Sequence, residues 1–155
     1  MTDKRPSVRI WYENVAAITA SGRRPLARLR PQAHVHGGLR LEIGGRLVPH
    51  LGYFGPDDVC FDSWLDELAL AAEALAVPGG RHVYDEGEQG QPAFVFEREG
   101  DTGYFSIIDA AYSGGVADSG WQRVEFQPTD FIAAYEDFRT SFLAALRAAP
   151  GGSSC

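Results

Sequence analysis

The first regular pattern in the chain is an alternation of apolar side chains with charged or aromatic neighbours. Across residues 8–13 the apolar positions are Val8, Ile10 and Tyr12. A period of two is typical of a half-buried β-strand. Residues 15–19 continue the pattern after a kink at Asn14, so the chain is predicted to enter the fold as one long strand.

A hairpin is predicted around a pair of glycines. Residues 39–43 alternate in the same way, Gly44 and Gly45 follow, and residues 46–48 return to apolar side chains. Adjacent glycines supply the positive φ angles that a two-residue hairpin turn requires. The sequence therefore predicts two antiparallel strands at this position.

Between these strands lies a segment without a clear period. Residues 21–38 contain two prolines, four arginines and two histidines. Such a mixture is typical of a connection rather than a regular element. We interpret it as an exposed arginine-rich loop with a short strand at residues 26–29.

A second set of strands is predicted in the next part of the chain. Runs with strand-like patterns occupy residues 81–84, 93–97, 104–109 and 121–126. Residues 99–103 join two of them as a hairpin. The segments 85–92 and 112–120 are rich in glycine and read as loops.

Two amphipathic helices are predicted, at about residues 63–77 and 130–148. Asp62 or Ser63 caps the first helix, and Ser63 forms a capping box with Asp66. Pro78 follows its end, since proline cannot continue the hydrogen-bond ladder. Thr129 is the predicted cap of the second helix.

The order strands, helix, strands, helix predicts an α+β fold. We expect a single domain over residues 1–155, with an antiparallel sheet of about six to eight strands in two hairpin sets and both helices packed on one face. A chain of this length can bury one sizeable core. Residues 1–6 and 150–155 are expected to form disordered tails.

Composition narrows the class of protein. Hydrophobic residues make up 45% of the chain and aromatic residues 12%, which excludes an intrinsically disordered protein. No apolar run approaches the roughly 20 residues that span a membrane, and no secretory signal is predicted at the amino terminus. The two cysteines, Cys60 and Cys155, are too few for a disulfide framework, so we predict a reduced, cytoplasmic protein.

Charge is divided unevenly along the chain. Residues 1–50 carry nine lysines and arginines against three carboxylates, a balance of +6. Residues 51–155 carry five arginines against eighteen carboxylates, a balance of −13, and the two sum to the net charge of −7. Such asymmetry bears on partners and association rates more than on fold, and it favours a macromolecular partner.

Residues suited to catalysis or metal binding are few. His34 and His36 share one side of an extended segment, and with His50 and a carboxylate they form an alternative hypothesis of a small metal- or ligand-dependent enzyme. No cysteine pair or HExxH motif accompanies them, so no metal or cofactor is predicted. Cys60 precedes a helix, and we interpret it as a small buried residue rather than a nucleophile.

The arginine-rich segment suggests a second alternative, a nucleic-acid-associated regulator. Four cations suited to phosphates are close in sequence: Arg23, Arg24, Arg28 and Arg30. The balance of −13 in the remainder would repel the same polyanion. We therefore do not predict nucleic-acid binding.

The acidic loops with aromatic neighbours are the predicted partner-binding surface. It comprises Asp85, Glu86, Glu88, Tyr112, Asp118 and Trp121. Aromatic anchors are frequent hot spots of interfaces, and complementary charge speeds encounter with a basic partner. The alternative is that Trp121 belongs to the core and the acids only keep the domain soluble.

Residues from about 60 to 149 resemble WapI-type immunity proteins of bacterial polymorphic-toxin systems and related actinobacterial proteins of unknown function. The resemblance lies in residues 61–68 (FDSWLDEL), in the strand 92–97 (PAFVFE), and in residues 124–126 running into the apolar stripe from Phe131 to Leu146. It implies a non-enzymatic protein that inhibits a secreted toxin by covering its active surface. The residues and the resemblance together predict an immunity or antitoxin-like inhibitor with a protein partner.

Overall fold

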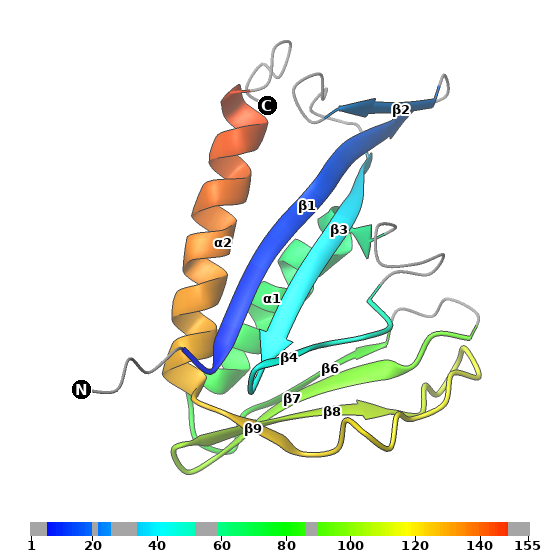
Figure 1. The fold of residues 1–155 in the computed structure, drawn as a ribbon. Coiled ribbons are helices and arrows are strands. Elements are labelled where there is room, and N and C mark those ends of the chain that lie inside the picture. The colour runs from blue at the N-terminus through cyan, green and yellow to red at the C-terminus, as the bar shows by residue number, and fades with distance from the viewer. Residues whose placement is uncertain (1–5, 20–21, 26–33, 52–58, 86–89, 149–155) are drawn as a thin grey trace.

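The first five strands form one antiparallel sheet (Figure 1). In the computed structural model, which describes residues 6–19, 22–25, 34–51, 59–85 and 90–148, the strand order is β2-β1-β3-β4, and β5 also pairs with β3. The bounds are β1 Val8–Thr19, β2 Gly22–Pro25, β3 His34–Ile43, β4 Arg46–Leu47 and β5 Val59–Cys60. β1 and β3 therefore form the centre of this sheet.

The predicted long strand and the glycine hairpin are both confirmed. β1 pairs with β3 from Val8 to Ile18, and the register shifts between Glu13 and Ala16, where the kink was expected. Gly44 and Gly45 have φ angles of 60° and 80° and join β3 to β4. A type I′ turn needs this left-handed conformation at both positions.

The arginine-rich segment is more regular than predicted. β2 pairs with the end of β1, and β3 begins at His34, so both ends of the predicted loop are strand. The reason is that the long alternating β1 offers a pairing edge on each side, which overrides the local proline and glycine content. The short strand expected at residues 26–29 lies outside the described residues.

Four later strands form a second antiparallel sheet in the order β6-β7-β8-β9. Their bounds are β6 Arg81–Asp85, β7 Ala93–Glu99, β8 Thr102–Ile108 and β9 Val124–Phe126. The β7–β8 turn is shorter than expected because Glu99 and Thr102 already pair. β9 begins later than the predicted residue 121, after Arg123 with a φ of 49°.

Both predicted helices exist, but each begins earlier than the predicted caps. Helix α1 spans Phe61–Leu75 and helix α2 spans Pro128–Ala148. The expected caps at Ser63 and Thr129 are therefore wrong, because both residues lie in a first helical turn. For α2, Pro128 explains the shift, since its fixed φ and missing N–H suit the first helical position.

A hydrogen-bond lock joins the start of α2 to the start of β1. The backbone N–H and the hydroxyl of Ser7 both donate to Asp130 Oδ2 at 2.8 Å, and Ser7 Oγ accepts from the Gln127 N–H at 2.8 Å. A carboxylate in the first helical turn also suits the positive end of the helix dipole. The start of the described chain is thus held to the start of the last helix.

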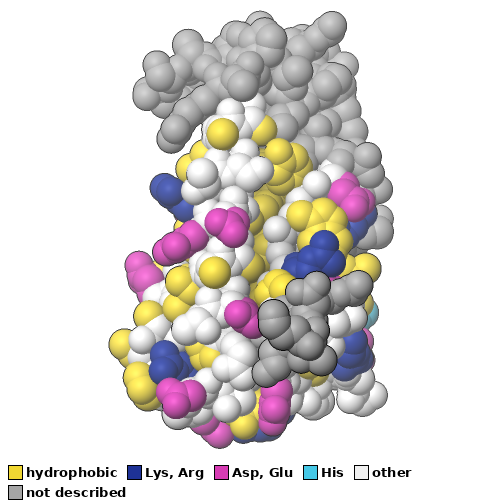
Figure 2. Space-filling model, turned by 60° about the vertical axis from the view of Figure 1, so that its left-hand side comes forward, with side chains coloured by type: hydrophobic (Ala, Val, Ile, Leu, Met, Phe, Trp, Pro, Cys, Tyr) yellow, Lys and Arg dark blue, Asp and Glu magenta, His cyan; other side chains and the backbone are white. Residues whose placement is uncertain are grey.

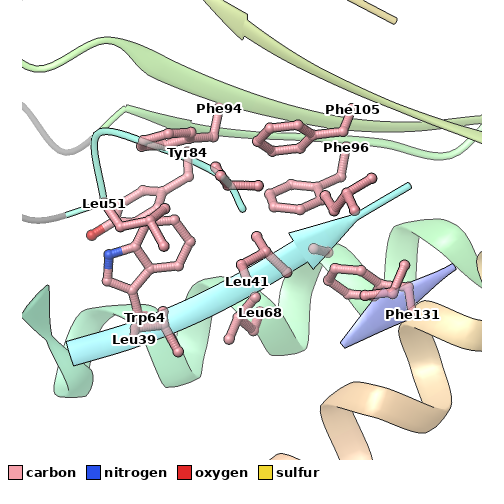
Figure 3. Close-up of a cluster of buried hydrophobic side chains, with 14 of the residues drawn as sticks. Leu39, Leu41, Leu51, Trp64, Leu68, Tyr84, Phe94, Phe96, Phe105 and Phe131 are labelled. Atoms are coloured by element: carbon pink, nitrogen blue, oxygen red, sulfur yellow. The ribbon is translucent and has the colours of Figure 1, made fainter. Parts of the chain in front are cut away.

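The core lies where the two sheets meet helix α1 (Figure 3). α1 packs against β3 of the first sheet and against β6 and β7 of the second, while α2 packs against β1 and α1. The Trp64 ring of α1 lies 4.8 Å from the ring of Tyr84 and 5.4 Å from that of Phe94. Fully buried side chains of this size contribute about 2–3 kcal/mol each, so α1 stabilises both sheets.

The predicted α+β class with antiparallel strands and two helices is confirmed, and the two strand sets form separate sheets. Helices α1 and α2 pack on the first sheet. The expected tails at 1–6 and 150–155 lie outside the described residues except for Pro6, which is exposed. Neither described helix is long and apolar enough to cross a membrane.

Candidate functional site

The predicted surface falls largely on the chain between β8 and β9, where we call residues 109–121 the 109–121 connection. Tyr112, Asp118 and Trp121 belong to it, and Asp85 at the end of β6 contacts it. Glu86 and Glu88 lie outside the described residues. The described members of the predicted site are therefore brought to one region of the molecule (Figure 1).

Asp85 fixes the first part of the 109–121 connection. Its Oδ2 accepts a hydrogen bond from the Ala111 N–H at 3.1 Å. Next to it, the Gly90 N–H donates to the Ser113 carbonyl at 2.9 Å, and Ser113 Oγ donates to the Gln91 carbonyl. These bonds attach the residues around Tyr112 to the chain that leaves β6 and enters β7.

Gly115 allows a close approach in the middle of the connection. A Cβ at this position would lie 2.0 Å from the Gln91 carbonyl oxygen, so only glycine fits without a shift of the backbone. The Ala110 N–H donates to the Gly115 carbonyl at 2.9 Å, and Asp109 Oδ1 accepts from the Ala117 N–H at 2.7 Å. The connection is therefore held by its own backbone as well as by its neighbours.

Asp118 fixes the last part of the connection. Its Oδ1 accepts from the Gly120 N–H at 2.9 Å, and its Oδ2 lies 3.1 Å from His50 Nε2. The Gly120 N–H, and after it the His50 ring, hold the pKa of the Asp118 carboxyl below its ordinary value. Both contacts favour the charged form of the carboxyl.

Arg46 of β4 supports the same end of the connection. Its Nη2 donates to the Gly120 carbonyl at 2.8 Å, and its guanidinium lies 4.2 Å from the centre of the Trp121 ring. Because Arg46 and His50 both follow the glycine hairpin, the first sheet positions a loop of the second sheet. This contact also joins the basic part of the sequence to the acidic part.

Trp121 belongs to the core. Only 5% of it is exposed, and its ring packs edge-on against Phe105 at 5.8 Å. The Arg46 guanidinium lies over a face of the ring. The alternative left open by the sequence therefore holds for Trp121: it anchors the connection from below and does not present a free aromatic surface.

Tyr112 has the opposite environment. It is 90% exposed, and Val116 in the same connection is 75% exposed. The backbone on either side of Tyr112 is bonded through Ala111 and Ser113. The geometry thus presents a large aromatic side chain and a nearby aliphatic one on a backbone that is already ordered.

The histidines do not form a site in the part of the chain that the structure describes. His50 contacts Asp118, and His82 Nε2 contacts Glu67 Oε2. The side chains of His34, His36 and Cys60 lie outside the description, although His36 and Cys60 are paired residues of β3 and β5. No group of three metal-ligating side chains occurs among the described residues.

The arginine-rich segment is only partly placed. Arg23 and Arg24 lie on β2, opposite Ile18 and Ala17 of β1, whereas Arg28 and Arg30 lie outside the described residues. Other cations of the first sheet pair with its own carboxylates: Arg9 with Glu42 at 3.2 Å, and Arg40 with Glu13 at 3.3 Å. In these pairs the charge of the first sheet is neutralised locally.

The sequence analysis missed a groove between β1 and α2. It has a volume of about 260 Å³ and is lined by Ile10, Trp11, Tyr12, Asp137, Phe138 and Ser141. Part of the groove could have been predicted from the sequence, because residues 8–13 were predicted as a strand. Which edge of that strand would lack a partner depends on long-range pairing, which periodicity does not specify.

Comparison of the chain with protein-family models, with curated proteins and with solved structures gave no match.

Proposed function

We propose that this is a cytoplasmic, non-enzymatic protein that binds and inhibits another protein through the 109–121 connection. The partner proposed is a basic protein such as a secreted toxin domain, as the resemblance to immunity proteins implies. The observation that carries the proposal is the 90% exposure of Tyr112 on a backbone fixed by hydrogen bonds.

Exposure of a large aromatic side chain on an ordered loop is favourable for binding. Tyrosine provides a large contact area at a low cost in conformational entropy and is enriched among interface hot spots. A backbone ordered before binding loses less entropy on association. Asp85 and Asp118 thus act as positioning residues, since both accept hydrogen bonds from the backbone of the connection.

Charge supports a basic partner. The balance of −13 over residues 51–155 produces a field that attracts cationic surfaces and accelerates encounter. The association rate constant of such a complex should fall as the salt concentration rises, because screening shortens the range of the field. The apolar contact of Tyr112 and Val116 would then determine how slowly the complex dissociates.

The test uses the product of the neighbouring gene as the probe, with affinity measured by titration calorimetry. Tyr112→Ala should weaken binding by about 2 kcal/mol or more, the effect of removing a hot spot. Leu70→Ala is the matched control, because Leu70 is an exposed apolar residue on α1, away from the connection. Equal affinity of wild type and Tyr112→Ala would rule out this surface.

A second variant tests the role of position rather than contact. Asp85→Ala removes the carboxylate oxygen that accepts from the Ala111 N–H. It should weaken binding less than Tyr112→Ala and should speed hydrogen exchange of the Ala111 amide. Weaker binding without faster exchange would instead indicate that Asp85 contacts the partner directly.

A further inference from the structure

The outer edge of β1 is unpaired over residues Val8–Glu13 among the described strands. On one side of β1 these residues pair with β3 from Ile43 back to Gly38. On the other side β2 pairs only with Ala16–Thr19. Along these six residues, alternate backbone N–H and C=O groups therefore point to an open edge, which we call the β1 edge.

The backbone of the β1 edge is not interrupted in the way that protects many edge strands. Natural edges are commonly interrupted by proline, glycine bulges or inward-pointing charges. Residues 8–13 contain no proline or glycine, and the register shift comes only after Glu13. Val8, Ile10 and Tyr12 point toward the helices and pack on the core, so the strand is held rigidly in place.

The groove beside this edge is apolar where a further strand would lie. Tyr12 packs edge-on against Phe138 and Phe142 of α2, at centroid distances of 6.2 and 5.4 Å. Figure 2, which brings the left side of Figure 1 forward, shows hydrophobic side chains at the surface along the line between α2 and the sheet. A strand added to β1 would cover them, as in recognition by β-strand addition.

The opposite face of the β1 edge carries two exposed charges around an aromatic ring. Arg9 lies 4.8 Å from the centre of the Trp11 ring, and Trp11 Nε1 donates to Glu13 Oε1 at 3.0 Å. The side chains of Arg9 and Glu13 are 51% and 47% exposed. Each can therefore accept a second ionic partner across a new strand pair.

We propose that the β1 edge is a homodimer interface, in which Arg9–Glu13 pairs antiparallel with the same segment of a second copy, centred on Trp11. In this register Arg9 of each copy faces Glu13 of the other. Ile10 faces Tyr12, and the two Trp11 residues face each other. The contact is isologous and closed by a two-fold axis.

Self-complementarity is the reason for assigning a second copy as the occupant. The order Arg9, Trp11, Glu13 places opposite charges at equal distances from a central aromatic residue, so that reversal of the strand matches each charge with its opposite. Opposite charges and aromatic pairs directly across a strand pair are both favourable. A slip of one residue would move every side chain to the wrong face.

The interface is distinct from the surface proposed for the partner. α2 and the start of β1 lie at the left in Figure 1, whereas the 109–121 connection lies at the lower right. The dimer does not rest on the proposed function, and its test uses the purified protein alone. Because one added strand buries a limited area, we expect a dissociation constant in the micromolar range, about 1–100 µM.

The test is sedimentation equilibrium of the full chain from about 1 µM to about 1 mM, which brackets this affinity. Arg9→Glu and Glu13→Arg, each alone, place like charges opposite each other twice. Each should raise the dissociation constant about tenfold. An equimolar mixture of the two variants places opposite charges at both positions and should restore association as a heterodimer, detected by labelling one variant.

Folding and charge controls accompany the variants. Arg81→Glu and Glu125→Arg make the same charge changes on the second sheet and should leave association unchanged. Thermal unfolding of each variant shows whether loss of the Arg9–Glu42 or Glu13–Arg40 contact affects the fold. Recovery of association in the mixture shows that both variant chains are folded, because the mixture contains the same two chains. A monomer at all concentrations, or no recovery in the mixture, would overturn the proposal and leave the edge to a strand of another protein.

Discussion

The 109–121 connection and the contact between β1 and α2 are held by different kinds of interaction. We call this contact, around Tyr12, Phe138 and Phe142, the β1–α2 seam. The connection is fixed by hydrogen bonds between its backbone and the carboxylates of Asp85, Asp109 and Asp118. The seam is fixed by aromatic packing, with Phe142 of α2 stacked on Phe61 at 4.8 Å and packed edge-on against Tyr12 at 5.4 Å. One region is ordered by polar geometry and the other by burial.

Because of this difference, the seam mainly determines the stability of the fold, whereas the connection mainly determines the position of the Tyr112 side chain. Burial in the seam contributes in proportion to the apolar area removed from water and scarcely depends on pH. Each hydrogen bond in the connection contributes about 1 kcal/mol net, yet together they determine where Tyr112 points. Substitutions in the seam should therefore affect the whole fold, whereas substitutions in the connection should act locally.

The largest effect is expected for Phe142→Ala. Phe142 is fully buried and packs against Tyr12, Phe61 and Phe138. Loss of the ring should reduce the free energy of unfolding by about 3–5 kcal/mol through lost burial and a remaining cavity. Urea denaturation measures it. Val116→Ala in the connection is the control, with an expected change of about 0.5 kcal/mol or less.

An intermediate effect is expected for Gly115→Ala. Its Cβ would collide with the Gln91 carbonyl, and we expect a loss of about 2 kcal/mol in unfolding free energy together with faster exchange of the amides around Tyr112. Gly114→Ala is a matched neighbour with open space around it but a φ of 76°. It should cost only about 1 kcal/mol, the cost of a left-handed alanine. Equal effects of the two substitutions would contradict the close approach at Gly115.

The smallest effect is the pH dependence of Asp118. Because contacts with Gly120 and His50 lower its pKa in the folded state, Asp118 stabilises the protein above its ordinary pKa of 3.8 and loses that contribution as pH falls through the lower folded value. The difference in melting temperature between wild type and Asp118→Asn should therefore shrink between about pH 5 and pH 2. Parallel curves over this range would show that the carboxyl is not stabilised in the folded state.

Periodicity predicted the elements of the fold well, because the core-forming residues carry the pattern. Val8, Ile10 and Tyr12 show the strand period, and the paired Gly44 and Gly45 specify the turn. Helix starts were less accurate. Capping residues such as Ser63 are also tolerated inside a first turn, so a cap pattern does not fix the first residue of a helix.

The site was harder to predict, because exposure and contact depend on residues far apart in the sequence. Asp85 and Tyr112 were selected as neighbours, and they do lie in one region. Trp121 was placed among them by sequence proximity, but Phe105 and Arg46 determine its burial. Neither of these two contacts leaves a local pattern in the sequence.

The excess of positive charge in residues 1–50 does not predict where the described arginines of the first sheet find their partners. Arg9 and Arg40 pair with carboxylates of their own sheet, and Arg46 turns to the Gly120 carbonyl. The positive charge of Arg9 and Arg40 is therefore balanced by neighbouring carboxylates, whereas Arg46 keeps its charge at the 109–121 connection. A partner meets the field of the whole charge distribution.

The lock between Ser7 and Asp130 joins residues that are 123 positions apart, which has a consequence for biosynthesis. Translation adds residues at about 5–20 per second, so the first strand leaves the ribosome several seconds before the helix that covers it. During that interval the inner side of β1 has β3 beside it but no α2. The apolar side chains on that side are then exposed, so slower synthesis of the last helix should increase aggregation of nascent chains.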